Sequence, residues 1–306
     1  MHNPFIVSPG SRIKLKDYDP KYNDNFLDRE TIKKIKNIEP DFTGKLNKEI
    51  AKELLPYGIR QLAKYQDILY AQNTYALLII FQAMDAAGKD SAIKHVMSGV
   101  NPQWCQVFSF KTPSAEELDH DYLWRSMKAL PERGRVGIFN RSYYEEVLAV
   151  RVHPEILDKQ QLPAEAKDKN IWQRRFTEIN NFEQYLVANG IIILKFFLNV
   201  SQEEQKKRFL ERIKLSEKNW KFSASDFQER AFWDDYMKAY EEVFNHTSTS
   251  WAPWHIIPAE RKWYTSLAVA YLITDKLQKL NLKYPTVSKE QKQQLLKVKE
   301  MLENEK

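Results

Sequence analysis

The stretch of sequence that decides the fold is YALLIIFQAMDAAGKDS, residues 75–91. Residues 75–81 are apolar and of strand length, and a helix is expected to begin near Lys89, so a buried strand should run through a turn into a helix. This arrangement is the framework of a phosphate-binding loop, in which backbone N–H groups and the helix N-terminus face a phosphate. Gly88 would let the backbone approach the phosphate closely, and Lys89 would add a positive charge.

The stretch departs from the usual loop pattern, G-x-x-x-x-G-K-[ST], at two positions. Ala83 stands at the first glycine position, and Asp90 follows Lys89, so that Ser91 comes one residue late. An ordinary strand–turn–helix with an exposed lysine is therefore the alternative interpretation. Asp85 is unusual in such a loop, because a carboxylate repels phosphate unless a cation lies between them. We expect Asp85 either to hold Mg²⁺ or to orient an incoming phosphate acceptor.

Four further segments share the apolar, strand-length character of residues 75–81 and are expected to be buried strands. They are residues 106–110, 136–139, 191–198 and 255–257. Helical patterns lie between them, at residues 91–99, 115–129, 143–150, 169–189, 202–213 and 226–244. This alternation predicts an α/β fold in three layers, α/β/α, with a parallel five-stranded sheet between the helices. Ligands bind beyond the carboxyl ends of such strands, so we expect active-site residues just after positions 81, 110, 139, 198 and 257.

The segments outside this core predict two appendages. Residues 1–70 are expected to form an N-terminal helical extension, with a polar arm, a short helix near residues 29–36 and a longer helical pattern over 46–72. Pro56 leaves open whether that longer pattern forms one helix or two. The core would span residues 71–285, and residues 286–306 would add a charged peripheral helix.

Composition limits the class of protein. The chain has 306 residues, 43% hydrophobic and 29% charged, which is typical of a globular protein. It contains no apolar run long enough to span a membrane and no signal-peptide pattern. Its single cysteine, Cys105, excludes an intramolecular disulfide and predicts a cytoplasmic location. The formal net charge of +6 favours anionic partners without choosing among them.

A second segment with functional residue types is RVGIFNRSYYEE, residues 135–146. A buried strand is expected to end here and to deliver Asn140 and Arg141 to the carboxyl edge of the sheet. Asn140 is neutral, so it is a weaker metal ligand than aspartate and a better hydrogen-bonding group. Arg141 can make bidentate contacts with phosphate. The alternative is a surface ion pair between Arg141 and Glu145.

A third segment is strongly basic and follows the strand at 191–198. Arg208 and Arg212 are four residues apart, so they share one face of the expected helix. A mobile lid over about residues 202–232 would look like this, and a solvated basic helix is the alternative. The cations between residues 206 and 221 are Lys206, Lys207, Arg208, Arg212, Lys214, Lys218 and Lys221.

Taken together, these segments resemble the polyphosphate kinase 2 family. The resemblance is carried by FQAMDAAGKD at residues 81–90, IKHVMSGVNP at 93–102 and FNRSYYEEVL at 139–148. The shorter motifs INNFE at 179–183, APW at 252–254 and IPA at 257–259 fit as well. It covers roughly residues 10–280, and several separated motifs in one order are far more specific than a single loop.

The resemblance implies a P-loop kinase-like core with a helical lid. It implies transfer of a phosphoryl group between inorganic polyphosphate and a nucleotide, with Mg²⁺. The second motif looks like the class III branch, which is associated with both nucleoside mono- and diphosphate acceptors. AMP, ADP and GDP are therefore the expected acceptors. Many relatives in the other branches have aspartate where Asn140 stands. A homo-oligomer, dimer or tetramer, is expected, with neither nucleic acid nor a membrane as partner.

The resemblance also implies roles for single residues. Asp85 would organise the metal and the acceptor phosphate, Lys89 would neutralise the transferring phosphate, and Arg141 would contact phosphate. The family usually has glycine where Ala83 stands, which costs of order 1 kcal/mol if the site needs a positive φ and little otherwise. The other residues expected to bind phosphate or substrate are Ala86, Ala87, Gly88, Asp90, Ser91, Lys94, Asn140, Glu145, Arg208 and Arg212.

Two other functions stay open at the level of the sequence. An ATP-dependent kinase for a small molecule or nucleoside could use the same fold, because a fold does not fix the substrate. A non-enzymatic binder of nucleic acid or polyphosphate could use the basic segment, with strongly salt-dependent binding. Asp85 argues against the second alternative, because a carboxylate in the loop brings nothing to a protein that only binds anions.

Overall fold

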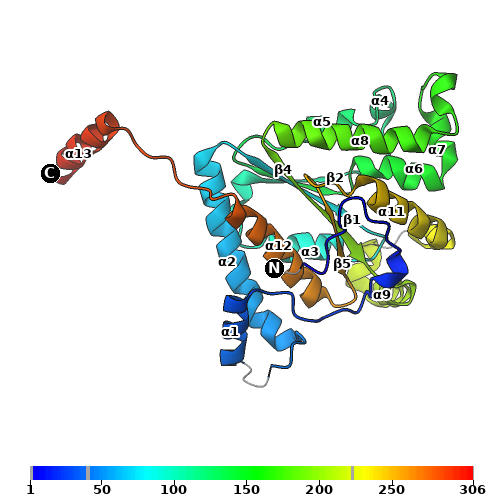
Figure 1. Ribbon diagram of the computed structural model, residues 1–306, viewed down its shortest axis with the longest axis horizontal. Helices are drawn as coiled ribbons and strands as arrows, with labels where there is room; N and C mark the ends of the chain where they lie inside the picture. Colours follow the sequence, from blue (N-terminus) through cyan, green and yellow to red (C-terminus); the bar gives the residue numbers. More distant parts are fainter. Residues whose placement is uncertain (1–2, 39–41, 222–223, 306) are drawn as a thin grey trace.

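The computed structural model describes residues 3–38, 42–221 and 224–305, and its centre is one parallel sheet (Figure 1). The strands lie in the order β2-β3-β1-β4-β5, which confirms the predicted five-stranded parallel sheet. β1 is the central strand, and all seven of its residues are buried. The strands are β1 (Ala76–Gln82), β2 (Cys105–Ser109), β3 (Val136–Asn140), β4 (Ile191–Asn199) and β5 (Trp254–Pro258).

Helices cover both faces of the sheet, as the three-layer prediction requires. Side chains alternate along β1, so that Leu77 and Ile79 face one layer and Leu78 and Ile80 the other. The first face packs against α2 (Lys48–Gln72), α3 (Lys89–Val96) and α12 (Lys262–Lys279). The second face packs against α8 (Ile171–Ala188) and α11 (Trp233–Thr247). Each fully buried leucine or isoleucine contributes roughly 1.5–3 kcal/mol to the stability of this arrangement.

Three of the expected helices are interrupted, and one of them, at residues 226–244, is divided among α10 (Ala224–Glu229), η6 (Arg230–Phe232) and α11. Residues 115–129 form two short helices, α4 (Ala115–Leu118) and α5 (Trp124–Lys128), because a capping box at Ser114 starts the first and a turn at Asp121 separates them. Residues 143–150 form a 3-10 turn, η3 (Tyr143–Val147), followed by α6 (Ala149–Val152). The sequence did not predict the elements between them and α8, which are α7 (Pro154–Lys159) and η4 (Ala164–Lys167).

The structure decides whether residues 46–72 form one helix or two, and whether residues 106–110 form a buried strand. α2 continues through Pro56, whose neighbours on that side of the helix are exposed, so the hydrogen bond that proline cannot make is lost where water can replace it. The expectation that residues 106–110 are a buried strand is wrong. β2 is an edge strand, and Gln106, Val107 and Ser109 are exposed.

The N-terminal arm joins the sheet. Residues 5–7 run antiparallel to β5: the amide of Val7 donates to the carbonyl of Trp254 (2.9 Å), and the amide of Ile256 donates to that of Phe5 (2.8 Å). η1 (Leu15–Asp17) and α1 (Arg29–Ile38) follow before α2. The domain boundaries at residues 70 and 285 stay predictions. Among the described residues, no helix is long and apolar enough to cross a membrane.

The remaining elements are one 3-10 turn before β2, the elements of the expected lid region and a C-terminal helix. α9 (Gln202–Lys214) follows β4, and η2 (Pro102–Trp104) precedes β2. α13 (Lys289–Glu303) stands apart from the body of the protein at the end of an extended linker (Figure 1). The rest of the expected lid contains η5 (Ser216–Lys221), α10 (Ala224–Glu229) and η6 (Arg230–Phe232).

Candidate active site

The loop between β1 and α3 has the backbone conformation that an anion-binding loop needs. Gly88 caps the N-terminus of α3 with φ 110°, and Ala86 has φ 61°, so both residues adopt left-handed conformations. These turns place successive amides around the start of α3, where the helix dipole favours negative charge. A substituent at Gly88 would be strained at this φ, which explains why glycine is needed here.

Ala83 has an ordinary backbone conformation. In the described part of the chain, the non-glycine residues with positive φ are Asn73, Ala86, Arg141 and Asn281. The methyl group of Ala83 is buried beside the apolar core and does not force a strained φ. Of the two outcomes left open by the sequence, the one with little cost therefore applies.

The ammonium of Lys89 lies inside the loop. Its Nζ donates to the carbonyl oxygens of Ala83 (2.8 Å) and Met84 (3.4 Å). Burial lowers the pKa of Lys89, and the nearby guanidinium of Arg141 lowers it further, whereas Asp85 and other carboxylates oppose the shift. A lysine held in this way can transfer its hydrogen bonds from the loop carbonyls to a phosphate.

Arg141 and Asp85 meet across the site. The Nη2 of Arg141 donates to Oδ1 of Asp85 at 2.7 Å, although 56 residues separate the two in sequence. Glu145 and Asp85 raise the pKa of Arg141 against the opposing effect of burial. Arg141 follows β3 directly with φ 64°, so the end of the strand turns sharply at this residue. The carboxyl edge of the sheet thus brings these charged residues together, as predicted.

Asn140 also reaches α3. Its Nδ2 donates to Oδ1 of Asp90 in the first turn of the helix, at 2.8 Å. Asp90 is exposed, and Asn140 holds its carboxylate toward β3. Together with the Arg141–Asp85 pair, this hydrogen bond fastens the end of β3 to both sides of the loop.

Arg208 does not lie on a solvent-facing lid surface. It is 5% exposed, and all five of its N–H donors are paired within the protein. They bind Oε1 of Glu204 (2.9 Å) and the carbonyls of Ala86 (3.1 Å), Ala87 (2.7 Å), Ala259 (2.7 Å) and Glu260 (3.1 Å). This geometry leaves no N–H group of Arg208 for a phosphate. The arginine connects α9 to the back of the loop and to the end of β5.

Gln205 is a site residue that the sequence did not reveal. Its Nε2 donates to the carbonyl of Asp85 at 2.9 Å, and its Oε1 accepts from Arg230 at 2.8 Å. Gln205 lies three residues before Arg208 on the buried face of α9. The only indication in the sequence was a polar residue three positions before Arg208. Its role could not be predicted, because it depends on the packing of α9 against the loop.

Several other candidates lie further from the Arg141–Asp85 pair. The hydroxyl of Ser91 lies 3.4 Å from Nδ1 of His95, one turn along α3, and Lys94 is exposed on the same helix. Arg212 lies one turn beyond Arg208, with its guanidinium 5.5 Å from the ring centre of Phe209. The side chains of Lys218 and Lys221 lie outside the described residues.

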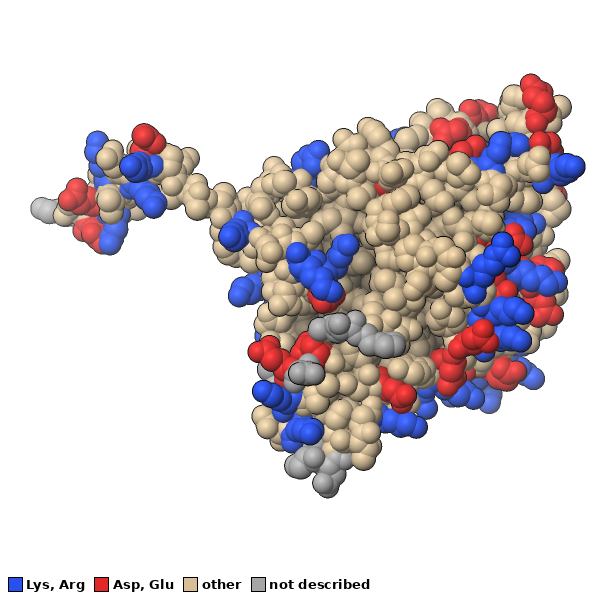
Figure 2. All heavy atoms as spheres, viewed as in Figure 1, with Lys and Arg blue, Asp and Glu red and all other residues tan. Residues whose placement is uncertain are grey.

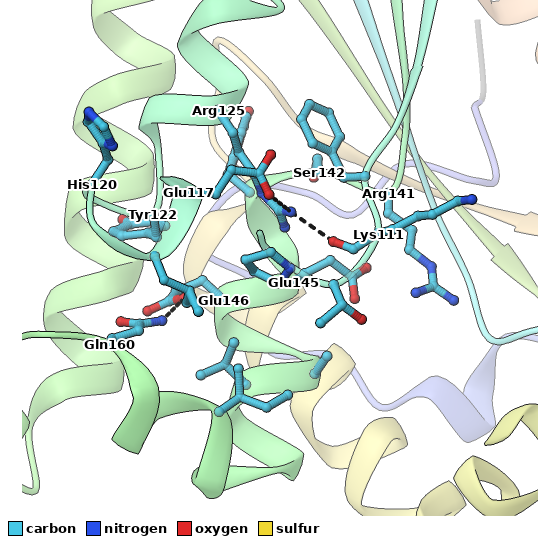
Figure 3. Close-up of a pocket in the computed structure, with 18 of the residues that line it drawn as sticks. Lys111, Glu117, His120, Tyr122, Arg125, Arg141, Ser142, Glu145, Glu146 and Gln160 are labelled. Atoms are coloured by element: carbon cyan, nitrogen blue, oxygen red, sulfur yellow. Dashed lines mark hydrogen bonds and ion pairs between the residues drawn. The ribbon is translucent and has the colours of Figure 1, made fainter. Parts of the chain in front are cut away.

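A cavity opens beside Arg141 (Figure 3). Its volume is about 110 Å³, and it combines an aromatic wall with charged groups. Arg125 lies 5.3 Å from the ring centre of Phe110 and donates to the carbonyl of Lys111 at 2.8 Å. Residues just after position 110 were expected at the site, and Lys111 is one of them. The sequence did not single out Arg125, because only the fold brings α5 to this edge.

Comparisons with known proteins agree with this geometry. The model of the family "Polyphosphate kinase 2 (PPK2)" matches residues 45–285. The chain is 52% identical over 257 residues to an ADP-polyphosphate phosphotransferase of Rhodopseudomonas palustris, covering 84% of this chain and 89% of that protein. It is 42% identical over 253 residues to an AMP/ADP-polyphosphate phosphotransferase of Meiothermus ruber, covering 82% and 91%.

A solved structure has the same fold. The crystal structure of polyphosphate kinase 2 from Arthrobacter aurescens TC1 superposes with a TM-score of 0.79 at 36% identity, covering 97% of this chain and 99% of that one. From the motifs, the site geometry and these matches, the chain belongs to the polyphosphate kinase 2 family.

Proposed function

We propose that this protein transfers a phosphoryl group between inorganic polyphosphate and AMP or ADP, and also GDP. The observation that carries the proposal is the meeting of Asp85 and Arg141 over a loop that buries Lys89. The relatives in R. palustris and M. ruber, named as polyphosphate phosphotransferases, support the substrate class. Polyphosphate carries no nucleobase that could form specific hydrogen bonds, so its recognition depends on positively charged side chains that contact its phosphate groups.

The loop and its neighbouring cations would hold the donor. The amides around the start of α3 face a phosphate, and Lys89 exchanges its carbonyl partners for phosphate oxygens. Arg141 lies at the end of β3 beside Asp85, where its guanidinium can neutralise charge on the transferring group. Gln205 and Arg208 hold the loop from behind through its carbonyls. We propose these two as positioning residues.

The acceptor would lie in the cavity beside Arg141. Its aromatic and cationic wall, with Phe110 and Arg125, suits a nucleobase or ribose, and Arg141 and Lys111 stand where the acceptor phosphates would lead toward the loop. A nucleotide phosphate is already ionised at neutral pH, so it can attack without a strong general base. Alignment and charge neutralisation are then the main contributions of the protein.

The donor set fits Mg²⁺. In the described ranges, no group of three or more histidine, cysteine or acidic side chains is placed to hold a metal alone. Mg²⁺ is usually bound through one or two carboxylates together with substrate phosphates and water. Asp85 would hold the ion through Oδ2, because its other carboxylate oxygen, Oδ1, accepts the hydrogen bond from Arg141. When bound, the ion would neutralise phosphate charge between donor and acceptor.

The proposal defines the partners as well. We expect a homo-oligomer that binds polyphosphate and nucleotides, and neither nucleic acid nor a membrane is a partner that we propose. A cytoplasmic location stays a prediction.

An assay with polyphosphate as sole phosphoryl donor tests the proposal. Purified protein is supplied with Mg²⁺ and polyphosphate, and with AMP, ADP or GDP in separate reactions; ADP should yield ATP. An ATP-dependent kinase would form no ATP under these conditions. Asp85→Asn and Lys89→Ala should each reduce the rate strongly, and wild-type rates in both variants would contradict the site assignment.

A further inference from the structure

α13 carries an apolar face that the body of the protein does not cover. Leu295, Val298, Met301 and Leu302 are exposed by 59%, 51%, 70% and 60%. At the helical rotation of roughly 100° per residue, these four side chains share one stripe about 120° wide. Figures 1 and 2 show α13 standing away from the remainder of the molecule. A helix with this amphipathic pattern normally packs its stripe against another surface.

A groove of matching character lies on the body between α1, α2 and α12. It has a volume of about 680 Å³. Its lining includes the buried side chains of Leu54 and Leu267 and the partly buried rings of Tyr65 and Tyr271. Along α2 it extends from residue 54 to residue 65, which is about 16 Å at 1.5 Å per residue. The stripe of α13, from residue 295 to residue 302, needs only about 11 Å.

The charges around the two surfaces are complementary. Lysines flank the apolar stripe of α13 on both sides, and three carboxylates line the groove with only one lysine among them. The flanking lysines are Lys292, Lys297 and Lys299. The carboxylates are those of Asp28, Glu30 and Asp275, and the lysine is Lys279. α13 carries four lysines and three glutamates, so its net charge of +1 complements the excess of carboxylates in the groove to a modest degree.

The linker leads α13 away from the groove of its own chain. The hydroxyl of Tyr284 donates to Oδ2 of Asp67, which lies on α2 beyond the part that lines the groove. The linker then continues outward (Figure 1). We propose that α13 docks its stripe into the α1–α2–α12 groove of a second copy of this chain. Two copies would exchange their C-terminal helices reciprocally, which fills both grooves and closes a twofold-symmetric dimer.

Cross-linking between single-cysteine variants tests the exchange. In a Cys105→Ser background, Val298→Cys lies at the middle of the stripe and Gln61→Cys in the middle part of the groove, so contact is expected for either direction of α13. When the two variants are mixed and oxidised, we expect a disulfide-linked dimer on a non-reducing gel. Glu300→Cys, on the opposite face of α13, is the matched control and should give little product.

The alternative outcomes contradict the proposal. The first is an equal yield from Val298→Cys and Glu300→Cys. The second is an intrachain disulfide, detected by peptide mapping, in the variant that carries both Val298→Cys and Gln61→Cys. That disulfide would show that α13 fills the groove of its own chain.

The mass of the particle in solution gives a second test with the full-length chain. Leu295→Asp combined with Leu302→Asp should halve the mass measured by light scattering, because both aspartates would enter an apolar groove. Glu300→Gln should leave the mass unchanged. Circular dichroism should show the same thermal unfolding of the body in all three proteins. An unchanged mass in the double variant would overturn the proposal.

Discussion

Arg141 and Asp85 are joined by a hydrogen bond of 2.7 Å between Nη2 and Oδ1, which connects the end of β3 to the loop after β1. The guanidinium is 37% exposed and the carboxylate 21%, so both remain accessible to a substrate. In the absence of substrate the two charges neutralise each other. A bound phosphate would compete for Arg141 and free the carboxylate for a cation. The pair therefore links occupation of the phosphate site to the availability of Asp85.

We predict that Arg141→Met lowers kcat for polyphosphate-driven ATP formation by about 10²–10³-fold, the usual effect of removing one preorganised charge-stabilising group. Arg141→Lys should recover part of the loss, because lysine keeps the charge but not the planar fork. Steady-state kinetics with ADP as acceptor measure both values. Arg174→Lys is the control, since Arg174 pairs with Asp168 away from the site; an equal loss there would remove the special role of Arg141.

Arg208 should act on the position of the loop. Arg208→Lys supplies fewer donors than the five that are used, so loop and β5 carbonyls lose partners, at a cost of roughly 1–3 kcal/mol in unfolding free energy. We expect kcat to fall, with a smaller change in KM for polyphosphate. Urea unfolding and steady-state kinetics test this.

Arg212→Lys is the matched control for Arg208, because Arg212 lies one turn away on the same helix. It should leave the unfolding free energy almost unchanged. If Arg208→Lys raised only the KM for polyphosphate and left stability intact, direct phosphate binding by Arg208 would be the better explanation.

Two alanines of the loop should respond differently to glycine. Ala86 has φ 61°, a conformation that costs a non-glycine residue about 1–2 kcal/mol, so Ala86→Gly should relieve strain. Ala83 does not have a positive φ, so Ala83→Gly should leave kcat within about twofold and should not stabilise the fold. Thermal unfolding and kinetics of the two variants distinguish them. A gain in stability at Ala83 alone would reverse the assignment.

A charged pair is buried beneath the segment that follows Arg141. Lys195 and Glu183 are both fully buried with a 2.6 Å contact, and Glu183 also accepts from the hydroxyls of Tyr143 and Tyr144. Burial lowers the pKa of Lys195, and Glu183 opposes this shift. Lys195→Met would leave the carboxylate without its cation, so we predict a loss of about 3–5 kcal/mol in unfolding free energy.

The double variant is the control for the buried pair. Lys195→Met with Glu183→Gln removes both charges, so its loss in urea unfolding should be clearly smaller than that of Lys195→Met. A double variant as unstable as the single one would show that packing, and not charge, is decisive at this position.

His255 should make the stability depend on pH. Burial lowers the pKa of His255 from about 6.5 to about 4. Between these values only the unfolded chain takes up the proton, so stability falls as the pH decreases from about 6.5 to about 4. The loss attributable to this residue is about 3 kcal/mol. The unfolding free energy of wild type relative to that of His255→Asn should fall by about 3 kcal/mol as the pH decreases from about 6.5 to about 4; a difference that is independent of pH would refute the prediction.

The sequence by itself determined the layered fold and much of the site. Four of the strands, β1, β3, β4 and β5, are short apolar runs that are buried as their composition predicts, and the alternation of strands with helices predicts a parallel sheet. The positions of Asp85, Lys89, Asn140 and Arg141 were predictable because each lies at the end of a strand or between that strand and the start of the next helix. Residues at strand ends necessarily meet at the carboxyl edge of a parallel sheet.

Only the tertiary structure decided the positions that depend on packing between distant segments. The basic run around Arg208 predicted a mobile lid with cations for phosphate, but Arg208 lies buried among carbonyls because α9 packs against the loop and the end of β5. β2 is exposed because it lies at the edge of the sheet, a position that its own residues do not reveal. Local sequence encodes which element a residue occupies, whereas the partners of a buried polar group are chosen by long-range contacts that no single segment contains.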